Sequence, residues 1–114
     1  MPKDYRLYLE EINEAIRKIE EYTKALSYEE FTMASMVTDA VIRNLEIIGE
    51  AVKKIPSEVR KEENTVDWKK IAGLRDILAH RYAYVRLEII WDIVKKKIPS
   101  LKEAVKERLS KDGE

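Results

Sequence analysis

The spacing of apolar residues is the feature that most restricts the fold of this 114-residue chain. Apolar side chains recur three and four positions apart through almost its whole length, which is the period of an α-helix. Only three glycines and three prolines interrupt the pattern, so few positions can break a helix. The sequence therefore predicts an all-α fold, an antiparallel bundle of about five helices joined by short connections.

Start and stop signals divide the N-terminal half into two long helices. The first is expected at about residues 4–26. Ser27 then reads as an N-cap, and Glu30 completes a capping box for a second helix over about 28–54. Pro56 ends that helix, because proline cannot continue the backbone hydrogen bonding.

The C-terminal half predicts shorter elements. Residues 57–64 are polar, with room for one helical turn, and Asp67 is the expected N-cap of a third helix over about 68–79. An irregular turn is expected at 80–85 and a fourth helix at about 86–97.

A short last helix should begin near Pro99, whose missing donor does no harm in a first turn. One domain covers residues 1–110, and 111–114 are expected to be a frayed tail. The predicted inward-facing residues are Tyr5, Tyr8, Leu9, Ile12, Ile16, Ile19 and Leu26, then Phe31, Ala34, Val41, Leu45, Ile48, Val52 and Ile55, then Trp68, Ile71, Leu74, Leu78, Leu87, Ile90, Trp91 and Val94, and finally Leu101, Ala104, Val105 and Leu109.

The second predicted helix is apolar on two sides. Its second stripe consists of Met33, Met36, Ala40, Ile47 and Ala51. A helix of this kind is central in its bundle or is shared between the core and a partner subunit. A small domain also has much surface relative to its core. Both points favour a homodimer.

Composition excludes several kinds of chemistry. The chain has no cysteine, so disulfides, zinc–thiolate sites and cysteine nucleophiles are excluded, and one histidine cannot build a histidine-rich metal site within a subunit. The balance of 22 basic and 22 acidic residues argues against broad electrostatic binding to nucleic acid, including DNA, but permits a local basic cleft.

No segment resembles a signal peptide or a membrane span, which predicts a soluble cytoplasmic protein. Abundant Lys and Glu without Gln hint at a thermophilic source.

The only histidine lies in the segment Arg75-Asp76-Ile77-Leu78-Ala79-His80-Arg81-Tyr82. On a continuous helix Arg75 and His80 would point about 140° apart. They converge only if the helix ends near Ala79 or a second subunit brings its own copy alongside. Asp76 precedes His80 by four positions, so on a helix it could hold the imidazole in one tautomer.

Arginine and histidine in one cleft suit cleavage of a phosphodiester. The guanidinium matches phosphate oxygens, and imidazole exchanges a proton near neutral pH. In RNA the adjacent 2′-hydroxyl can act as nucleophile, so no metal is required. The structural alternative is a histidine that stabilises a helix C-terminus, with Arg75 paired to Glu46 or Glu50 and Tyr82 a half-buried anchor. On spacing alone, that alternative is the default interpretation.

A family resemblance changes this balance. The run from Gly73 to Tyr82 resembles the R-x4-H-x-Y motif of the HepT-like branch of the HEPN proteins. The segment 43–51 (RNLEIIGEA) is similar to that family's second-helix signature, and Trp68 and Trp91 stand where the family tends to have tryptophan. The likeness runs from the first helix to Leu101.

The resemblance implies a homodimer whose two motif copies face one cleft. It also implies a metal-independent endoribonuclease toxin without a cofactor, whose antitoxin is an MNT-type nucleotidyltransferase. Arg75 and His80 would be catalytic, with Asp76 in support. Tyr82 would contact substrate and receive AMP from the antitoxin.

Further residues are candidates for the cleft and its rim. Arg43, Glu50, Arg81 and Tyr84 are possible cleft-lining residues, although Arg43, Glu46 and Glu50 also fit a plain row of ion pairs along one helix. A local basic rim for RNA is expected from Lys53, Lys54, Lys69, Lys70 and Arg81, whereas Lys95, Lys96 and Lys97 are expected to be a solvated helix end.

Two other functions compete with the nuclease. One is a non-catalytic HEPN module that binds nucleotide or scaffolds a partner nucleotidyltransferase. The other is a plain helical assembly protein. The intact set of Arg75, His80 and Tyr82 favours the nuclease, because a binding module has no evident need for all three. The sequence does not specify which RNA is cut.

Overall fold

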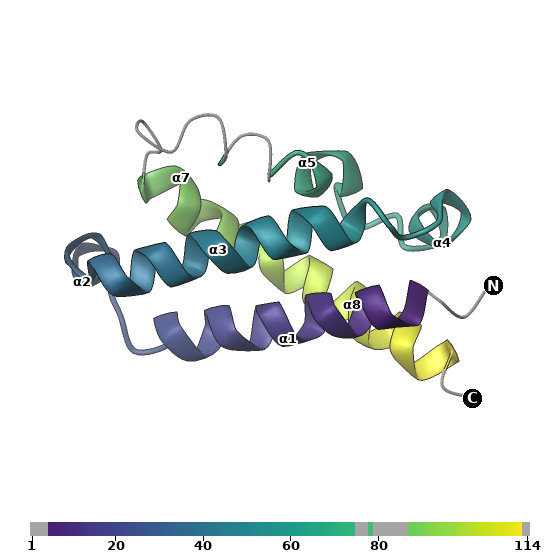
Figure 1. Cartoon of the computed structure of the whole chain (residues 1–114), viewed down its shortest axis with the longest axis horizontal. Coiled ribbons are helices and arrows are strands. Elements are labelled where there is room, and N and C mark those ends of the chain that lie inside the picture. Colours follow the sequence, from purple (N-terminus) through teal and green to yellow (C-terminus); the bar gives the residue numbers. More distant parts are fainter. Residues whose placement is uncertain (1–4, 75–77, 79–86, 113–114) are drawn as a thin grey trace.

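The computed structural model describes residues 5–74, 78 and 87–112, and every regular element in that part of the chain is helical. This confirms the predicted all-α bundle (Figure 1). The elements in chain order are α1 (Tyr5–Thr23), α2 (Tyr28–Met33), α3 (Ser35–Val52), α4 (Ser57–Glu62), α5 (Trp68–Ala72), α7 (Leu87–Asp92), η2 (Ile93–Lys97) and α8 (Ile98–Asp112).

The two long helices α1 and α3 lie side by side and run antiparallel (Figure 1). On other sides of this pair, α8 packs against α1 and α5 packs against α3. The core between them is aliphatic, and Ile12, Ile19 and Leu45 are fully buried within it. The predicted inward-facing residues are confirmed as buried or packed on the core, except for Leu26 and Ala34. These two are half-buried, and Ala34 lies at a helix break.

The connection from α1 to α2 follows the predicted capping box. The Glu30 backbone N–H donates to Ser27 Oγ at 3.1 Å, and the Ser27 N–H donates to the Glu30 carboxylate at 2.8 Å. Two donors that the first turn of α2 would leave unpaired are therefore satisfied. This cap fixes the direction in which the chain turns back along α1.

The predicted single helix over 28–54 is wrong in one respect, because it is broken at Ala34. Ala34 has a non-helical backbone (φ −101°, ψ 77°) between α2 and α3. Thr32 Oγ1 donates to the Glu29 carbonyl at 2.7 Å, and Thr38 Oγ1 donates to the Ser35 carbonyl at 2.9 Å. Hydroxyls that bond the backbone in this way compete with helical hydrogen bonding, which explains a break within a cluster of threonine and serine.

The second apolar stripe splits into a buried and an exposed part. Ala51 is buried, and Ile47 packs partly against the core. Met33 and Met36, on either side of the break, are 79% and 86% exposed. The α2–α3 junction therefore presents two large apolar side chains to solvent.

The fourth and last helices are continuous, which differs from the separate elements that the sequence predicts. A π-helical turn, η2, joins α7 to α8, and the Ile98 N–H bonds to the Ile93 carbonyl. Pro99 has no N–H, and its ring would collide with the carbonyl four residues earlier in a regular helix. Widening the preceding turn relieves this collision without ending the helix. At its other end α8 extends through Lys111 and Asp112, two positions of the predicted tail.

The described part of the chain contains no helix that is long and apolar enough to cross a membrane.

Loss of the α2 cap gives the first prediction. Ser27→Ala removes the side-chain acceptor for the Glu30 N–H and should lower the free energy of unfolding by about 1 kcal/mol. Urea denaturation followed by circular dichroism measures the change. Ser110→Ala, at an exposed position of α8, is the matched control and should not lower stability. Equal stability of the Ser27→Ala variant and the unsubstituted chain would contradict the role given to the cap.

Candidate functional site

The motif that carries the expected chemistry lies outside the described residues. The predicted site residues in this position are Arg75, Asp76, His80, Arg81, Tyr82 and Tyr84. Their roles remain predictions from the sequence. The structure describes the elements that precede and follow them, and the face of α3 beside α5.

The element that leads into the motif is fixed at its start. Asp67 caps α5, as predicted, by accepting a hydrogen bond from the Lys70 N–H at 3.2 Å. The Trp68 indole N–H donates to the Glu63 carbonyl at 2.9 Å. Glu63 is itself buried at the end of α4. The indole therefore ties α5 to the preceding connection through a shielded hydrogen bond.

Two buried leucines bracket the first half of the motif in the sequence. Leu74 and Leu78 are helical, only 3% and 2% exposed, and part of the main core. Residues four apart share one face of a helix. The structure thus confirms the predicted inward positions of both leucines, and the core holds the chain immediately before and after residues 75–77.

The element that follows the motif is also held by the core. In α7 Ile90 is 1% exposed, while Leu87 and Trp91 pack partly against the core. Because α5 packs on α3 and α7 packs on α2, the elements before and after the motif lie on the same side of the bundle (Figure 1).

On α3, Arg43 forms an ion pair with Glu46, as the alternative to a cleft-lining role predicts. Its guanidinium Nη1 lies 3.8 Å from the Glu46 Oε1, and the Arg43 side chain is 72% exposed. Exposed pairs one helical turn apart contribute only a few tenths of a kcal/mol. Glu50 is also an exposed residue of this helix. A cleft-lining role for Arg43 and Glu50 stays a prediction.

The lysines expected to form a basic rim are exposed on neighbouring elements. Lys53 and Lys54 follow the last residues of α3, and Lys69 and Lys70 lie in α5, which packs on α3. The two pairs therefore lie on or beside elements that contact each other. This arrangement supplies local positive charge in a chain whose net charge is zero.

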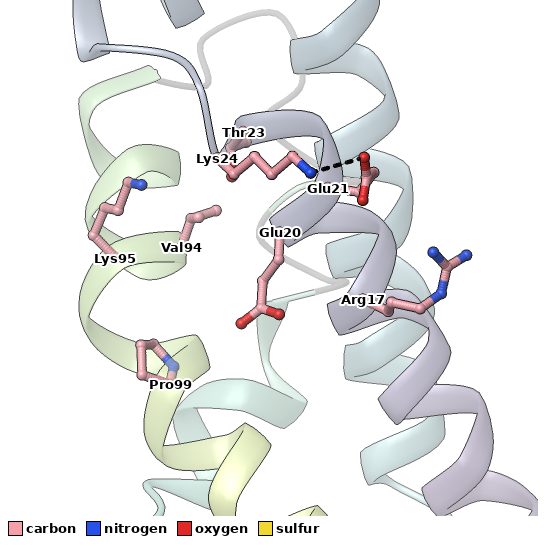
Figure 2. Close-up of a pocket in the computed structure, with 8 residues that line it drawn as sticks. All are labelled: Arg17, Glu20, Glu21, Thr23, Lys24, Val94, Lys95 and Pro99. Atoms are coloured by element: carbon pink, nitrogen blue, oxygen red, sulfur yellow. Dashed lines mark ion pairs between the residues drawn. The ribbon is translucent and has the colours of Figure 1, made fainter.

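A surface pocket of about 510 Å³ lies between α1 and the η2–α8 helix (Figure 2). Most of its charged lining residues are in ion pairs. Lys24 pairs with Glu21 at 3.2 Å, and Lys102 binds both carboxylate oxygens of Glu20 at 3.0 and 3.1 Å. Figure 2 shows the ends of Arg17 and Lys24 turned away from the side formed by η2.

Arg17 is engaged with a residue outside the pocket. Its guanidinium donates two hydrogen bonds to Glu14, at 2.9 and 2.8 Å, which lower the pKa of the carboxyl group and raise the pKa of the guanidinium. Arg17 and Lys24 are thus committed to intramolecular pairs, and the third cation that lines this pocket, Lys95, rests on the Trp91 ring. The pocket therefore lacks a set of cations that converge on one anion.

A second pocket, of about 320 Å³, was not predicted from the sequence. It lies between α2 and the α7–η2 helix, and its lining residues are Tyr28, Glu88, Trp91, Asp92, Lys95 and Lys96. The Trp91 ring centroid lies 5.0 Å from that of Phe31 and 6.0 Å from that of Tyr28. The Lys95 Nζ lies 4.6 Å from the centroid of the Trp91 ring.

The prediction of a helix end at Lys95, Lys96 and Lys97 is therefore wrong, whereas the predicted exposure to solvent is confirmed for Lys95 and Lys96. The three lysines make up most of the π turn inside a continuous helix, and Lys95 covers an aromatic ring. The sequence signal for this pocket was the tryptophan followed four residues later by lysine, a spacing that places both on one helical face. Its other wall comes from α2 and could not be assigned from local pattern.

The described residues contain no group of three or more acidic or histidine side chains placed to hold a metal ion.

Comparison with known proteins gives a consistent result. The family model described as ribonuclease HepT-like matches residues 12–108. A provisionally named RNase of Caldanaerobacter subterraneus subsp. tengcongensis is 46% identical over 110 residues, covering 96% of this chain and 98% of the relative. A provisionally named ribonuclease HepT of Thermococcus cleftensis is 43% identical over 102 residues, covering 90% of this chain and 93% of the relative.

A further relative is longer than this chain. This relative is a protein of Methanocaldococcus jannaschii that is named as a gamma-glutamylcyclotransferase and, provisionally, as an RNase. It is 48% identical over 105 residues, which cover 92% of this chain. The chain spans about half of that relative, 47% of its length. No solved structure matches the chain. The all-helical bundle and the match over residues 12–108 together establish that this chain belongs to the HepT-like ribonuclease family of HEPN proteins.

Proposed function

We propose that this chain is the toxin of a HEPN/MNT toxin–antitoxin pair and acts as a metal-independent endoribonuclease. The observation that carries the proposal is the complete R-x4-H-x-Y motif, Arg75 to Tyr82, inside the region that matches the ribonuclease family. The names of relatives such as the Thermococcus ribonuclease HepT support RNA as the substrate.

The chemistry follows from the two motif side chains. His80 takes the proton of the 2′-hydroxyl, and the 2′-oxygen attacks the adjacent phosphorus. The bond to the 5′-oxygen breaks, leaving a 2′,3′-cyclic phosphate and a 5′-hydroxyl that regains a proton. The Arg75 guanidinium stabilises the charge that develops on the phosphoryl oxygens, and its planar fork fits two of them. Asp76 orients the imidazole.

A homodimer supplies the second half of the cleft in this proposal. Two motif copies that face each other would bring an arginine and a histidine together without requiring both from one helix face. The exposed Met33 and Met36 at the α2–α3 junction support such an association, because two large apolar side chains so close in the sequence provide apolar surface that a partner subunit can bury.

Control by an MNT-type nucleotidyltransferase acts through Tyr82. The tyrosine oxygen attacks the α-phosphorus of ATP, pyrophosphate leaves, and the phenolic proton passes to solvent. The attached AMP adds bulk and negative charge beside Arg75 and His80. It would block the cleft and repel an RNA backbone.

The central prediction concerns His80. His80→Ala should reduce RNA cleavage on the order of 10²–10⁴-fold, because it removes the group that transfers protons. The assay uses purified protein, total cellular RNA and EDTA, after intact mass has shown that the chain is unmodified. Cleavage that survives the substitution would contradict the assignment of His80, and cleavage that EDTA abolishes would contradict a metal-independent mechanism. An unmodified chain that leaves the RNA intact favours the non-catalytic HEPN module.

The second prediction concerns Tyr82. When incubated with the cognate nucleotidyltransferase and ATP, the unsubstituted chain should gain mass in AMP increments and lose its nuclease activity. Tyr82→Phe should gain none and keep cutting RNA, since phenylalanine lacks the acceptor oxygen. Tyr22→Phe, at a half-exposed position of α1, is the matched control and should still be modified. An AMP increment on the Tyr82→Phe variant would place the modification elsewhere.

The third prediction concerns the dimer. Met36→Glu puts a charge on the exposed apolar surface and should shift the chain toward monomer, with cleavage reduced in parallel. Light scattering after size-exclusion chromatography reports the mass. Leu7→Glu, at a position of α1 that is 70% exposed, is the matched control and should leave the dimer intact. A Met36→Glu variant that stays dimeric would exclude this surface from the interface.

A further inference from the structure

The pocket between α2 and the α7–η2 helix has an aromatic wall that is open to solvent. Tyr28 is 38% exposed, and its ring stands beside the half-buried ring of Trp91. Phe31 supports Trp91 from the core side and is fully buried. The wall is therefore a fixed surface, held from behind by the core. Flat aromatic rings of this kind bind other flat rings by stacking.

Charged groups of both signs stand around this wall. Lys96 is paired with Asp92 at 3.1 Å, so its charge is largely satisfied within the helix. Lys95 forms no ion pair with a described residue, and its ammonium rests on the Trp91 ring. A cation–π contact at an exposed site is weak, so an anion can draw this ammonium away from the ring. The pocket thus combines an aromatic wall with one available cation.

We propose that this pocket is an accessory subsite for single-stranded RNA. One base stacks on the ring of Tyr28 and contacts Trp91, whose ring is inclined by 58° to that of Tyr28, and the phosphate beside the base pairs with Lys95. The inference rests on the proposed function in one respect, that the substrate is RNA. The pocket would contact this substrate through residues outside the motif segment.

The position of the pocket fits an extension of the nuclease site. Leu87, the first residue of α7, follows Tyr82 by five positions in the sequence. The pocket wall and the motif are thus joined by a short stretch of chain, which limits how far apart they can be. A strand bound at the motif would reach the pocket within a few nucleotides.

The test measures binding without cleavage. Fluorescence anisotropy follows labelled 2′-O-methyl oligonucleotides of C, A and U, which lack the 2′-hydroxyl nucleophile. Tyr28→Leu should weaken binding of all three strands by about fivefold or more, the lower range for loss of a base–aromatic stack. Lys95→Ala should reduce the slope of log Kd against log salt by about 0.7, the share of one phosphate contact on a single strand.

One control variant and a second readout make the result specific. Lys111→Ala removes an exposed lysine that pairs with Glu107 near the far end of α8, and it should leave both affinity and salt slope unchanged. Stacking should also quench the emission of Trp91, measured in a Trp68→Phe background where Trp91 is the only tryptophan. If Trp68→Phe fails to fold, the anisotropy series alone decides.

Failure of this inference is distinguishable from failure of the proposed function. If Tyr28→Leu and Lys95→Ala bind like the Lys111→Ala control while RNA is still cut, the subsite is wrong and the nuclease stands. Binding that depends on Tyr28 and Lys95 in a chain that cuts no RNA would support the subsite and contradict the nuclease. A pocket that instead holds a protein partner would leave Trp91 emission and the anisotropy series unaffected by these substitutions, which overturns the inference.

Discussion

The packing of α1 against α3 is the contact on which the rest of the structure depends. Both helices contribute side chains such as Ile12, Ile19 and Leu45 that have no solvent exposure, and burial of each contributes roughly 1.5–3 kcal/mol. The α5, α7 and α8 segments are shorter or interrupted and pack on this pair or on elements joined to it. Short helices are marginal by themselves, so their positions are set by the surface that the long pair presents.

The placement of charge explains how a neutral protein can act on an anionic polymer. Most described ion pairs are local, between residues three or four apart such as Arg17 with Glu14 and Lys24 with Glu21. Exposed pairs of this kind contribute little stability, but they neutralise each other's fields. Exposed lysines lie at particular places, such as Lys53 and Lys54 after α3 and Lys69 and Lys70 in α5. Affinity for RNA in the proposed function comes from these places and from the motif arginine.

The π turn shows how one residue alters the surroundings of a pocket. Pro99 removes a backbone donor, and the helix widens over residues 93–97 instead of stopping. The helix that follows the motif thereby continues into α8, which anchors it to α1. Trp91 lies just before the turn and Lys95 lies within it, so the aromatic wall and its cation belong to an element that is anchored at both ends.

The sequence by itself determined the helical class, the buried faces and the caps. Periodicity identifies the face of a helix that is buried, and the Ser27 and Asp67 caps are local patterns that depend on residues within one turn. The candidate site was also predicted from the sequence, because Arg75, His80 and Tyr82 occur in one short segment. That segment lies within residues 12–108, which match the family model.

Tertiary structure decided what depends on residues far apart in the chain. The break at Ala34 reflects competition between hydroxyl and backbone hydrogen bonds, which apolar spacing does not record. The continuity through Pro99 depends on packing that holds α8 in line with α7. Lys95 is exposed, as expected, but its ammonium lies over Trp91, and the other ring neighbours of Trp91, Tyr28 and Phe31, come from α2. Contacts between distant segments form only after the bundle has assembled, so no local pattern could specify them.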